Sequence, residues 1–332
     1  MRRALLILLG LVLIAAPVLA ALGWHWYRLP LPLPSAPFDF EVRSGATLSS
    51  VARQLHEAGV LPHPLPLIAL ARIERADRSI KAGSYEIDAG ITLPQLLAKL
   101  TQGDVTQTSL TIVEGTTFAD LKRALRDNPQ VTRTVIDLPD AELLARLGIS
   151  ARSPEGLFFP DTYFFAAGSS DLAILRRANR ALEARLRTAW EKRAAGLPLT
   201  TPYEALILAS IVEKETGKSA DRPLVASVLI NRLKLNMRLQ TDPTVIYGLG
   251  ERFDGNLRKR DLETDTTYNT YTREGLPPTP IALPSQVSLD AATRPAATEY
   301  LYFVSRGDGT SEFSTNLNDH ARAVNRYQKV PK

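Results

Sequence analysis

The chain has 332 residues, of which 45% are hydrophobic and 23% charged, a composition that excludes wholesale disorder and a polytopic membrane protein. Its length predicts two folded units, with one large domain as the alternative. The net charge is +5, but the longest basic run is residues 258–260, so no nucleic-acid-binding surface is indicated. The lack of cysteine excludes disulfides and thiolate metal sites, and the four histidines form no ligand-spaced pair. We therefore expect neither a metal nor another cofactor.

The N-terminus carries a membrane signal. Residues 4–23 are uncharged and long enough to span a bilayer as a helix. Arg2 and Arg3 precede this run and aromatic residues follow it, which predicts a single anchor with the rest of the chain outside the cytoplasm. A cleaved signal peptide is the alternative. We assign residues 1–27 to a cytoplasmic stub and transmembrane anchor, and the proline-rich residues 28–37 to a stiff tether.

A strand, turn and helix pattern occurs three times. In each copy, β-favouring residues lead to a glycine, and a threonine two positions later is placed to cap a helix with apolar residues at i, i+3 and i+7. The glycine and threonine pairs are Gly45 and Thr47, Gly90 and Thr92, and Gly115 and Thr117. We expect a small α+β region over residues 38–130. Its first copy, Phe38–Leu61, resembles the LysM fold, which binds N-acetylglucosamine-containing glycans; positioning of an enzyme domain is the alternative role.

A buried helix is predicted from about residue 202 to 216. Thr201 and Glu204 form a capping box, and residues 205–212 are apolar almost all round, as in a helix that runs through a core. Glu213 and Glu215 lie at its C-terminal end, where burial and the helix dipole favour a protonated carboxyl that can act as a general acid.

The two glutamates cannot serve one site together, because they project about 200° apart around the helix. Glu213 lies over the small side chains of Ala209 and Ser210, whereas Glu215 lies over Ile211 and Val212. Room for a ligand therefore favours Glu213 as the residue that faces a cleft. The alternative is that residues 213–215 form an ordinary solvated helix end.

Further along the chain, residues 172–195 have the spacing of an amphipathic helix, and residues 299–304 and 311–315 are typical of a β-hairpin. The segment from Ile207 to Thr216, with residues 155–163, 225–233, 237–248, 268–271 and 275–278, closely resembles the endolytic murein transglycosylases of the YceG-like (MltG) family. This resemblance runs from about residue 38 to the C-terminus. The chain departs from the family pattern at Thr279 and Leu283, which leaves the shape of that loop open.

The resemblance implies cleavage of the β-1,4 bond between N-acetylmuramic acid and N-acetylglucosamine inside nascent glycan strands, with 1,6-anhydro ends that terminate elongation. Glu213 would protonate the leaving oxygen and then accept the proton of the C6 hydroxyl. Five residues in the family's motifs would contact the glycan: Gln240, Asp242, Tyr247, Asn269 and Tyr271. Asp242 forming only a turn, and Asn269 satisfying only buried backbone, are the alternatives.

The expected architecture is α+β: a membrane helix, a LysM-like subdomain and a mixed α/β catalytic domain over residues 131–332 with a lysozyme-like catalytic helix. The resemblance also implies the inner (cytoplasmic) membrane, a periplasmic catalytic domain, and peptidoglycan synthases (penicillin-binding proteins) as partners. Two other functions remain open. A muramidase that uses water would need a second carboxylate, for which Asp242 is the candidate. A non-catalytic peptidoglycan-binding scaffold would not depend on Glu213.

Overall fold

The computed structural model describes residues 27–332 except 43–44, 78, 82, 103–106 and 329–332. The chain divides into two compact units. The first contains the described residues up to Ser109 together with Phe164–Ser169, and the second contains Leu110–Tyr163 and the described residues from Ser170 onward. No helix in these described ranges is long and apolar enough to cross a membrane, and the predicted anchor, residues 4–23, lies outside them.

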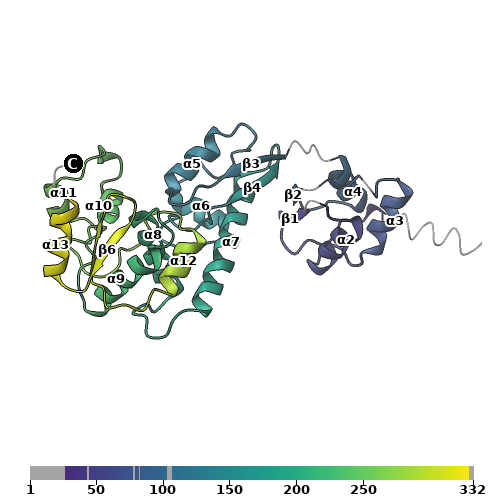
Figure 1. Cartoon of the computed structure of the whole chain (residues 1–332). Coiled ribbons are helices and arrows are strands. Elements are labelled where there is room, and N and C mark those ends of the chain that lie inside the picture. Colours follow the sequence, from purple (N-terminus) through teal and green to yellow (C-terminus); the bar gives the residue numbers. More distant parts are fainter. Residues whose placement is uncertain (1–26, 43–44, 78, 82, 103–106, 329–332) are drawn as a thin grey trace, which may run out of the picture. The chain divides into compact units, whose positions relative to one another are not determined.

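The first unit pairs a two-stranded sheet with three helices. Its elements are β1 (Phe38–Val42), α2 (Leu48–Glu57), α3 (Leu65–Ile73), β2 (Gly83–Ile87) and α4 (Leu93–Gln102) (Figure 1). Strands β1 and β2 are antiparallel, with Phe38 opposite Ile87 and Val42 opposite Gly83. One hydrophobic core joins the strands to all three helices. The unit therefore has a core of its own.

The threefold pattern of strand, turn and helix is confirmed. Gly45, Gly90 and Gly115 all have positive φ, between 73° and 90°. This left-handed conformation is open to glycine without the steric penalty that a Cβ brings. The Thr47 and Thr117 hydroxyls cap α2 and α5 (Phe118–Asp127) by accepting a backbone N–H of the first turn. The apolar positions of the three helices are buried as expected: Leu48, Val51, Leu55, Leu93, Leu96, Leu100, Phe118, Leu121 and Leu125.

The boundary between the units falls earlier than residue 130, because the third copy belongs to the second unit. Its turn packs on residues far along the chain: the Gly115 N–H donates to the Leu283 carbonyl, and the Leu283 N–H donates to the Thr116 carbonyl, both at 2.8 Å. A local pattern does not contain this information. The three copies share their local structure but not their surroundings.

The proline-rich segment is not wholly a free tether. The Leu31 N–H donates to the Ile91 carbonyl at 2.8 Å, and Pro30 bridges to Thr92. Leu31 and Leu33 pack against the core of the first unit. The prediction of a stiff tether over residues 28–37 is therefore wrong for this part, since its leucines are apolar surface that a neighbouring core can cover.

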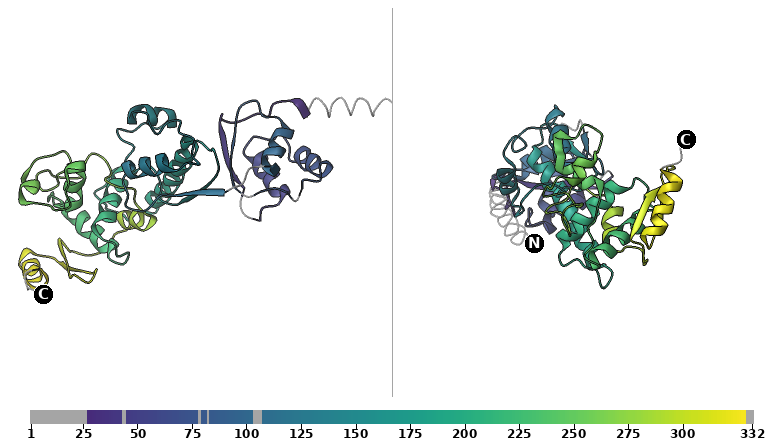
Figure 2. Two further views of the ribbon diagram at one scale, coloured as in Figure 1. Left: turned by 90° about the horizontal axis from the view of Figure 1, so that it is seen from above. Right: turned by 90° about the vertical axis from the view of Figure 1, so that its left-hand side faces the viewer.

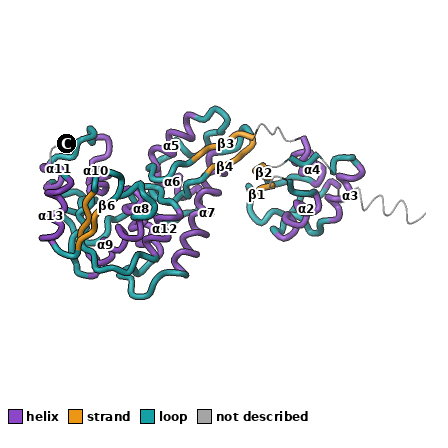
Figure 3. The backbone as a smooth tube through the Cα atoms, viewed as in Figure 1, coloured by secondary structure: helices purple, strands orange, loops and turns teal. Residues whose placement is uncertain are grey.

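The second unit is mainly helical (Figure 3). Besides α5, its elements are α6 (Asp140–Leu147), α7 (Asp171–Glu191), α8 (Pro202–Glu215), α9 (Arg222–Lys234), α10 (Asp242–Leu249), η1 (Gly250–Arg252), α11 (Lys259–Glu263), α12 (Gln286–Thr293), β5 (Tyr302–Ser305), β6 (Ser311–Ser314) and α13 (Leu317–Tyr327). The residues of β3 (Gln107–Thr111) and β4 (Thr162–Ala166) are divided between the two units. Strands β3 and β4 pair, and so do β5 and β6. Helix α8 contacts α7, α9, α10 and α12. It is therefore the central element of this unit.

Helix α8 forms as its sequence predicts. The Thr201 hydroxyl accepts the Glu204 N–H, and the Glu204 carboxylate accepts the Thr201 N–H in return. Every residue from Ala205 to Glu213 is buried. The helix ends at Glu215, because Thr216 takes an extended conformation. Its C-terminal turn is the part that carries the two candidate glutamates.

The C-terminal lobe, which we define as β5, β6 and α13, lies to one side of the other helices of this unit (Figure 2). Helix α13 packs on both strands, and β5 contacts α9. The β5–β6 hairpin pairs Tyr302 with Ser314 and Ser305 with Ser311, which confirms the predicted hairpin. The lobe is thus anchored to the helices through β5.

Replacing Thr201 by Ala should lower the free energy of unfolding of the second unit by about 1 kcal/mol, because the capping box then loses its hydroxyl acceptor. Thr201→Ser is the matched control and should remain close to wild type. Denaturant titration followed by circular dichroism measures both variants. Equal stability of Thr201→Ala and wild type would show that the box does not stabilise α8.

Candidate active site

A groove of about 500 Å³ opens beside the C-terminal end of α8. One wall comes from α8, α9, the loop before α10 and the segment around residue 271, and the other from the C-terminal lobe. The groove is lined by Glu215, Arg232, Leu239, Gln240, Asp242, Tyr271, Tyr302, Phe303, Val304, Ser305, Ser311, Leu317, His320, Val324 and Gln328. Three of the five predicted glycan contacts, Gln240, Asp242 and Tyr271, meet here.

Glu215 is the glutamate that faces this groove. Burial raises the pKa of its carboxyl to about 8, the negative charge of Asp242 adds to the rise, and the positive charge of Arg232 opposes it. No hydrogen bond or ion pair to this carboxyl is found among the residues that the structure describes. Glu215 is thus protonated at neutral pH and has its proton available to a ligand.

Asp242 is the second carboxyl of the groove and has a partner. The Tyr271 hydroxyl donates to Asp242 Oδ1 at 2.5 Å. Burial and this carboxylate raise the pKa of Tyr271 above its ordinary value, which keeps its hydroxyl a donor. Asp242 is the first residue of α10, where the positive end of the helix dipole favours a carboxylate. The groove therefore combines a proton donor with a fixed negative charge.

Gln240 reaches the groove through an unusual backbone conformation. Its φ is +51°, which a residue with a Cβ rarely adopts. The conformation is held because the Gln240 N–H donates to the Thr270 carbonyl at 3.1 Å. Next to it, the buried hydroxyls of Thr241, Thr244 and Thr270 bond to one another at 2.8 to 3.3 Å. This network fastens the loop before α10 to the segment that carries Tyr271.

Glu213 lies on the other side of α8, in a buried cluster. Its Oε1 accepts Arg222 Nη2 at 2.8 Å, and its Oε2 accepts the backbone N–H and the hydroxyl of Ser285 at 2.9 and 2.6 Å. The Glu213 side chain is 4% exposed and that of Arg222 is 7% exposed. Because Ser285 caps α12, the carboxylate also lies at the positive end of that helix. Both carboxylate oxygens are thus engaged in hydrogen bonds that connect α8 to α9 and α12.

The prediction that Glu213, rather than Glu215, faces the groove is therefore wrong. The room above Ala209 and Ser210 is filled by a segment far along the chain. The Ile281 N–H donates to the Ser210 hydroxyl at 3.0 Å, and Ser285 follows onto Glu213. The two glutamates do lie on opposite sides of α8, as predicted. The side with the small residues Ala209 and Ser210, however, is the side against which another segment packs. The groove lies on the side that the C-terminal lobe completes.

Two predicted glycan contacts, Tyr247 and Asn269, are not in the lining of the groove. Asn269 is fully buried: its amide donates to the carbonyls of residues 261, 262 and 264, and its oxygen accepts the Tyr271 N–H. The Tyr247 hydroxyl donates to buried Glu155 at 3.1 Å. Burial raises the pKa of that Glu155 carboxyl to about 7. Both predicted contacts are explained by loop and core hydrogen bonding.

Sequence reasoning missed the far wall of the groove. Arg232 is buried and donates to the carbonyls of Leu301 and Leu239 at 2.7 and 2.9 Å, so it joins α9 to both walls. Tyr302 and His320 stack with ring centroids 5.2 Å apart. Arg232 belongs to one of the segments that carry the family resemblance. No local sequence pattern indicates that it lies near Tyr302 and His320, which follow it by some 70 and 90 positions.

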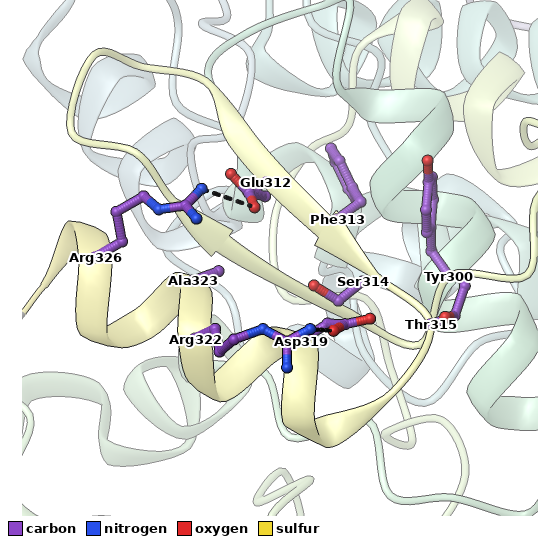
Figure 4. Close-up of a pocket in the computed structure, with 9 residues that line it drawn as sticks. All are labelled: Tyr300, Glu312, Phe313, Ser314, Thr315, Asp319, Arg322, Ala323 and Arg326. Atoms are coloured by element: carbon purple, nitrogen blue, oxygen red, sulfur yellow. Dashed lines mark hydrogen bonds and ion pairs between the residues drawn. The ribbon is translucent and has the colours of Figure 1, made fainter.

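A second hollow of about 370 Å³ lies on the opposite face of α13 (Figure 4). Asp319, Arg322 and Arg326 point into it, whereas His320 and Val324 of the same helix line the groove. Its charges are paired, since Arg322 contacts Asp319 and Arg326 lies 3.7 Å from Glu312. No group of metal-binding side chains is found in the part of the chain that the structure describes. Glu215 and Asp242 are the two carboxyl residues in the lining of the groove.

Comparisons with known proteins found related sequences and a related structure. The model of the YceG-like family matches residues 40–326. The endolytic murein transglycosylase of Bacillus subtilis (strain 168) is 30% identical over 311 residues, covering 87% of this chain and 84% of that protein. One of the same name from Streptococcus pneumoniae (strain D39) is 26% identical, and the match covers 94% of this chain and 63% of that protein's length. A crystal structure of a YceG-like protein from Listeria monocytogenes aligns with a TM-score of 0.55 at 28% identity, covering 86% of this chain and 98% of that one.

Glu213→Gln should lower the free energy of unfolding by about 3 kcal/mol, because it leaves the buried Arg222 guanidinium without its counter-charge. Glu215→Gln is the matched control two residues away and should not destabilise the fold. The double variant Glu213→Gln/Arg222→Met should recover part of the loss, since it removes both charges. Thermal and denaturant unfolding of the three variants measure this. A Glu213→Gln protein as stable as wild type would contradict a structural role for the ion pair.

Proposed function

The chain belongs to the YceG-like family, and from this membership we propose that it is an endolytic murein transglycosylase. It cleaves the β-1,4 bond between N-acetylmuramic acid and N-acetylglucosamine within peptidoglycan glycan strands and leaves 1,6-anhydro ends, which terminate strand elongation. The observation that carries the proposal is the groove at the end of α8, where Glu215 and Asp242 share the lining and burial raises the pKa of the Glu215 carboxyl. An open groove, unlike a closed pocket, suits a polymer that is cut internally.

The general acid in this proposal is Glu215, in place of Glu213. Glu215 gives its proton to the leaving glycosidic oxygen while the bond from that oxygen to C1 of the muramyl ring breaks. The C6 hydroxyl of the same ring forms the new bond to C1, and its proton passes to the Glu215 carboxylate. One carboxyl serves as acid and then as base, no water is consumed, and the enzyme returns to its starting protonation state.

Asp242 would act on the charge that develops in the sugar. The transition state of glycoside cleavage has oxocarbenium character, so a fixed carboxylate in the same groove lowers its energy. The bond from Tyr271 keeps this carboxylate in place. Gln240 and Tyr271 supply amide and hydroxyl groups to the sugar. In this mechanism Asp242 activates no water, which separates it from the muramidase alternative.

The remaining parts of the proposal concern location and partners. The apolar run of residues 4–23 would anchor the protein in the inner membrane with its catalytic unit in the periplasm. Peptidoglycan synthases are the expected partners, because cleavage of nascent strands has to occur where they are made. The order strand, helix, helix, strand from β1 to β2 supports a LysM-like role in glycan binding for the first unit.

Nascent glycan incubated with the wild-type protein should yield muropeptides with 1,6-anhydro ends, identified by mass spectrometry. Glu215→Gln should abolish these products, since an amide cannot donate the proton, and Glu213→Gln should retain them under conditions where it is folded.

The other outcomes select among the alternatives. Anhydro ends produced by Glu215→Gln would contradict its role as the acid. Reducing ends from the wild type would indicate a muramidase that uses water. A folded wild-type protein that binds glycan without cutting it would be a scaffold.

The rate of cleavage should fall as the pH rises through about 8, because Glu215 must be protonated to donate and is ionised above its pKa. Asp242→Asn removes a negative charge that raises this pKa, so it should move the fall in rate to lower pH. Profiles of kcat/KM against pH for both proteins test this. An alkaline limb that stays in place in Asp242→Asn would contradict the coupling between the two carboxyls.

A further inference from the structure

The C-terminal lobe supplies more than half of the lining of the groove. Its residues there come from β5, from the start of β6 and from one face of α13. The opposite face of α13 lines the separate hollow of Figure 4. None of these lobe residues was among the predicted site residues. Across the groove they face Glu215 and Asp242, so a sugar held for cleavage has this lobe as its other boundary.

Two side chains of the lobe, Tyr302 and His320, carry polar groups that make no hydrogen bond within the described part of the protein. Tyr302 and His320 stack with an angle of 23° between their rings, and both are only half-buried. Neither the phenol hydroxyl nor the imidazole makes a hydrogen bond to any residue in the described part of the chain, and His320 Nδ1 is enclosed without a partner. Enclosed polar atoms are normally paired in folded proteins, because leaving them unpaired is unfavourable.

We infer that Tyr302 and His320 form a saccharide-binding subsite that holds an N-acetylhexosamine ring of the glycan strand against the wall opposite Glu215. This inference rests on the proposed transglycosylase function and adds the residues that position its substrate. Flat rings with polar edges match a sugar, whose C–H faces are apolar and whose hydroxyl and N-acetyl groups need hydrogen-bond partners. Arg232 supports the subsite from beneath, with its guanidinium 5.1 Å from the centre of the Tyr302 ring.

A purely structural role for the stack is the competing explanation. In that case the rings only fasten the lobe to α9 through Arg232, and their loss would lower stability without a specific effect on substrate. The segment that leads into β5 has attachments to α9 that stay intact when the rings are changed. Asn231 donates to the carbonyls of Thr298 and Tyr300 at 2.8 and 3.0 Å, and Arg232 donates to Leu301. The variants below should therefore fold.

The test uses the full-length protein in detergent and uncross-linked glycan strands that carry stem peptides. Initial rates of anhydro-end formation give KM and kcat for each variant. Tyr302→Leu and His320→Leu should each raise KM about tenfold with little change in kcat, as expected for the loss of a hydrogen bond made in the bound complex. His320→Gln keeps a polar amide and should recover most of the loss. Arg322→Ala, on the other face of α13, is the matched control and should match wild type.

Three results would overturn the subsite. These are unchanged KM values in Tyr302→Leu and His320→Leu, an equal rise of KM in Arg322→Ala, or a lowered melting temperature that accompanies equal losses in His320→Leu and His320→Gln. Wild-type protein that makes no anhydro ends would instead refute the proposed function. The failure of the subsite and the failure of the function are thus separate observations.

Discussion

The buried ion pair between Glu213 and Arg222 fixes the end of the central helix, and the site depends on it. Glu213 joins the last turn of α8 to the first residue of α9 and, through Ser285, to the start of α12. A carboxylate held on this side of α8 leaves the residue two positions later pointing the opposite way. The fold thus directs Glu215 into the groove by immobilising its neighbour.

The two glutamates show how environment divides one residue type into two roles. Glu213 has a guanidinium, a hydroxyl and a backbone N–H around it, which stabilise a carboxylate. Glu215 has no such partners among the described residues and lies near a second negative charge, Asp242, which favours the protonated form. Opposed environments of this kind can give two residues of one type different roles, here a structural partner of Arg222 and a proposed proton donor. The separation here is achieved within a single helical turn.

Much of the fold could be predicted, because it is set by local rules. The glycine turns, the threonine caps of α2 and α5 and the capping box of α8 depend on residues within one or two helical turns, and these predictions are confirmed. The choice between Glu213 and Glu215 failed because it depends on Ile281 and Ser285, whose packing no local pattern reveals. The far wall of the groove could not be predicted for the same reason, since the lobe reaches it through tertiary contacts alone.

The left-handed backbone of Gln240 has a consequence for how the groove receives its ligand. The hydrogen-bonded threonine network next to Gln240 holds this strained conformation in place, so the free energy of folding offsets the strain before any ligand binds. The polar edge that Gln240 gives to the groove is then preorganised, and in the proposed function the association with glycan need not order it. A polymer substrate that has to thread through loses much conformational freedom of its own. Because this edge of the groove is already ordered, only the polymer loses conformational entropy on binding. In the proposed function this favours rapid binding of a strand that is still growing.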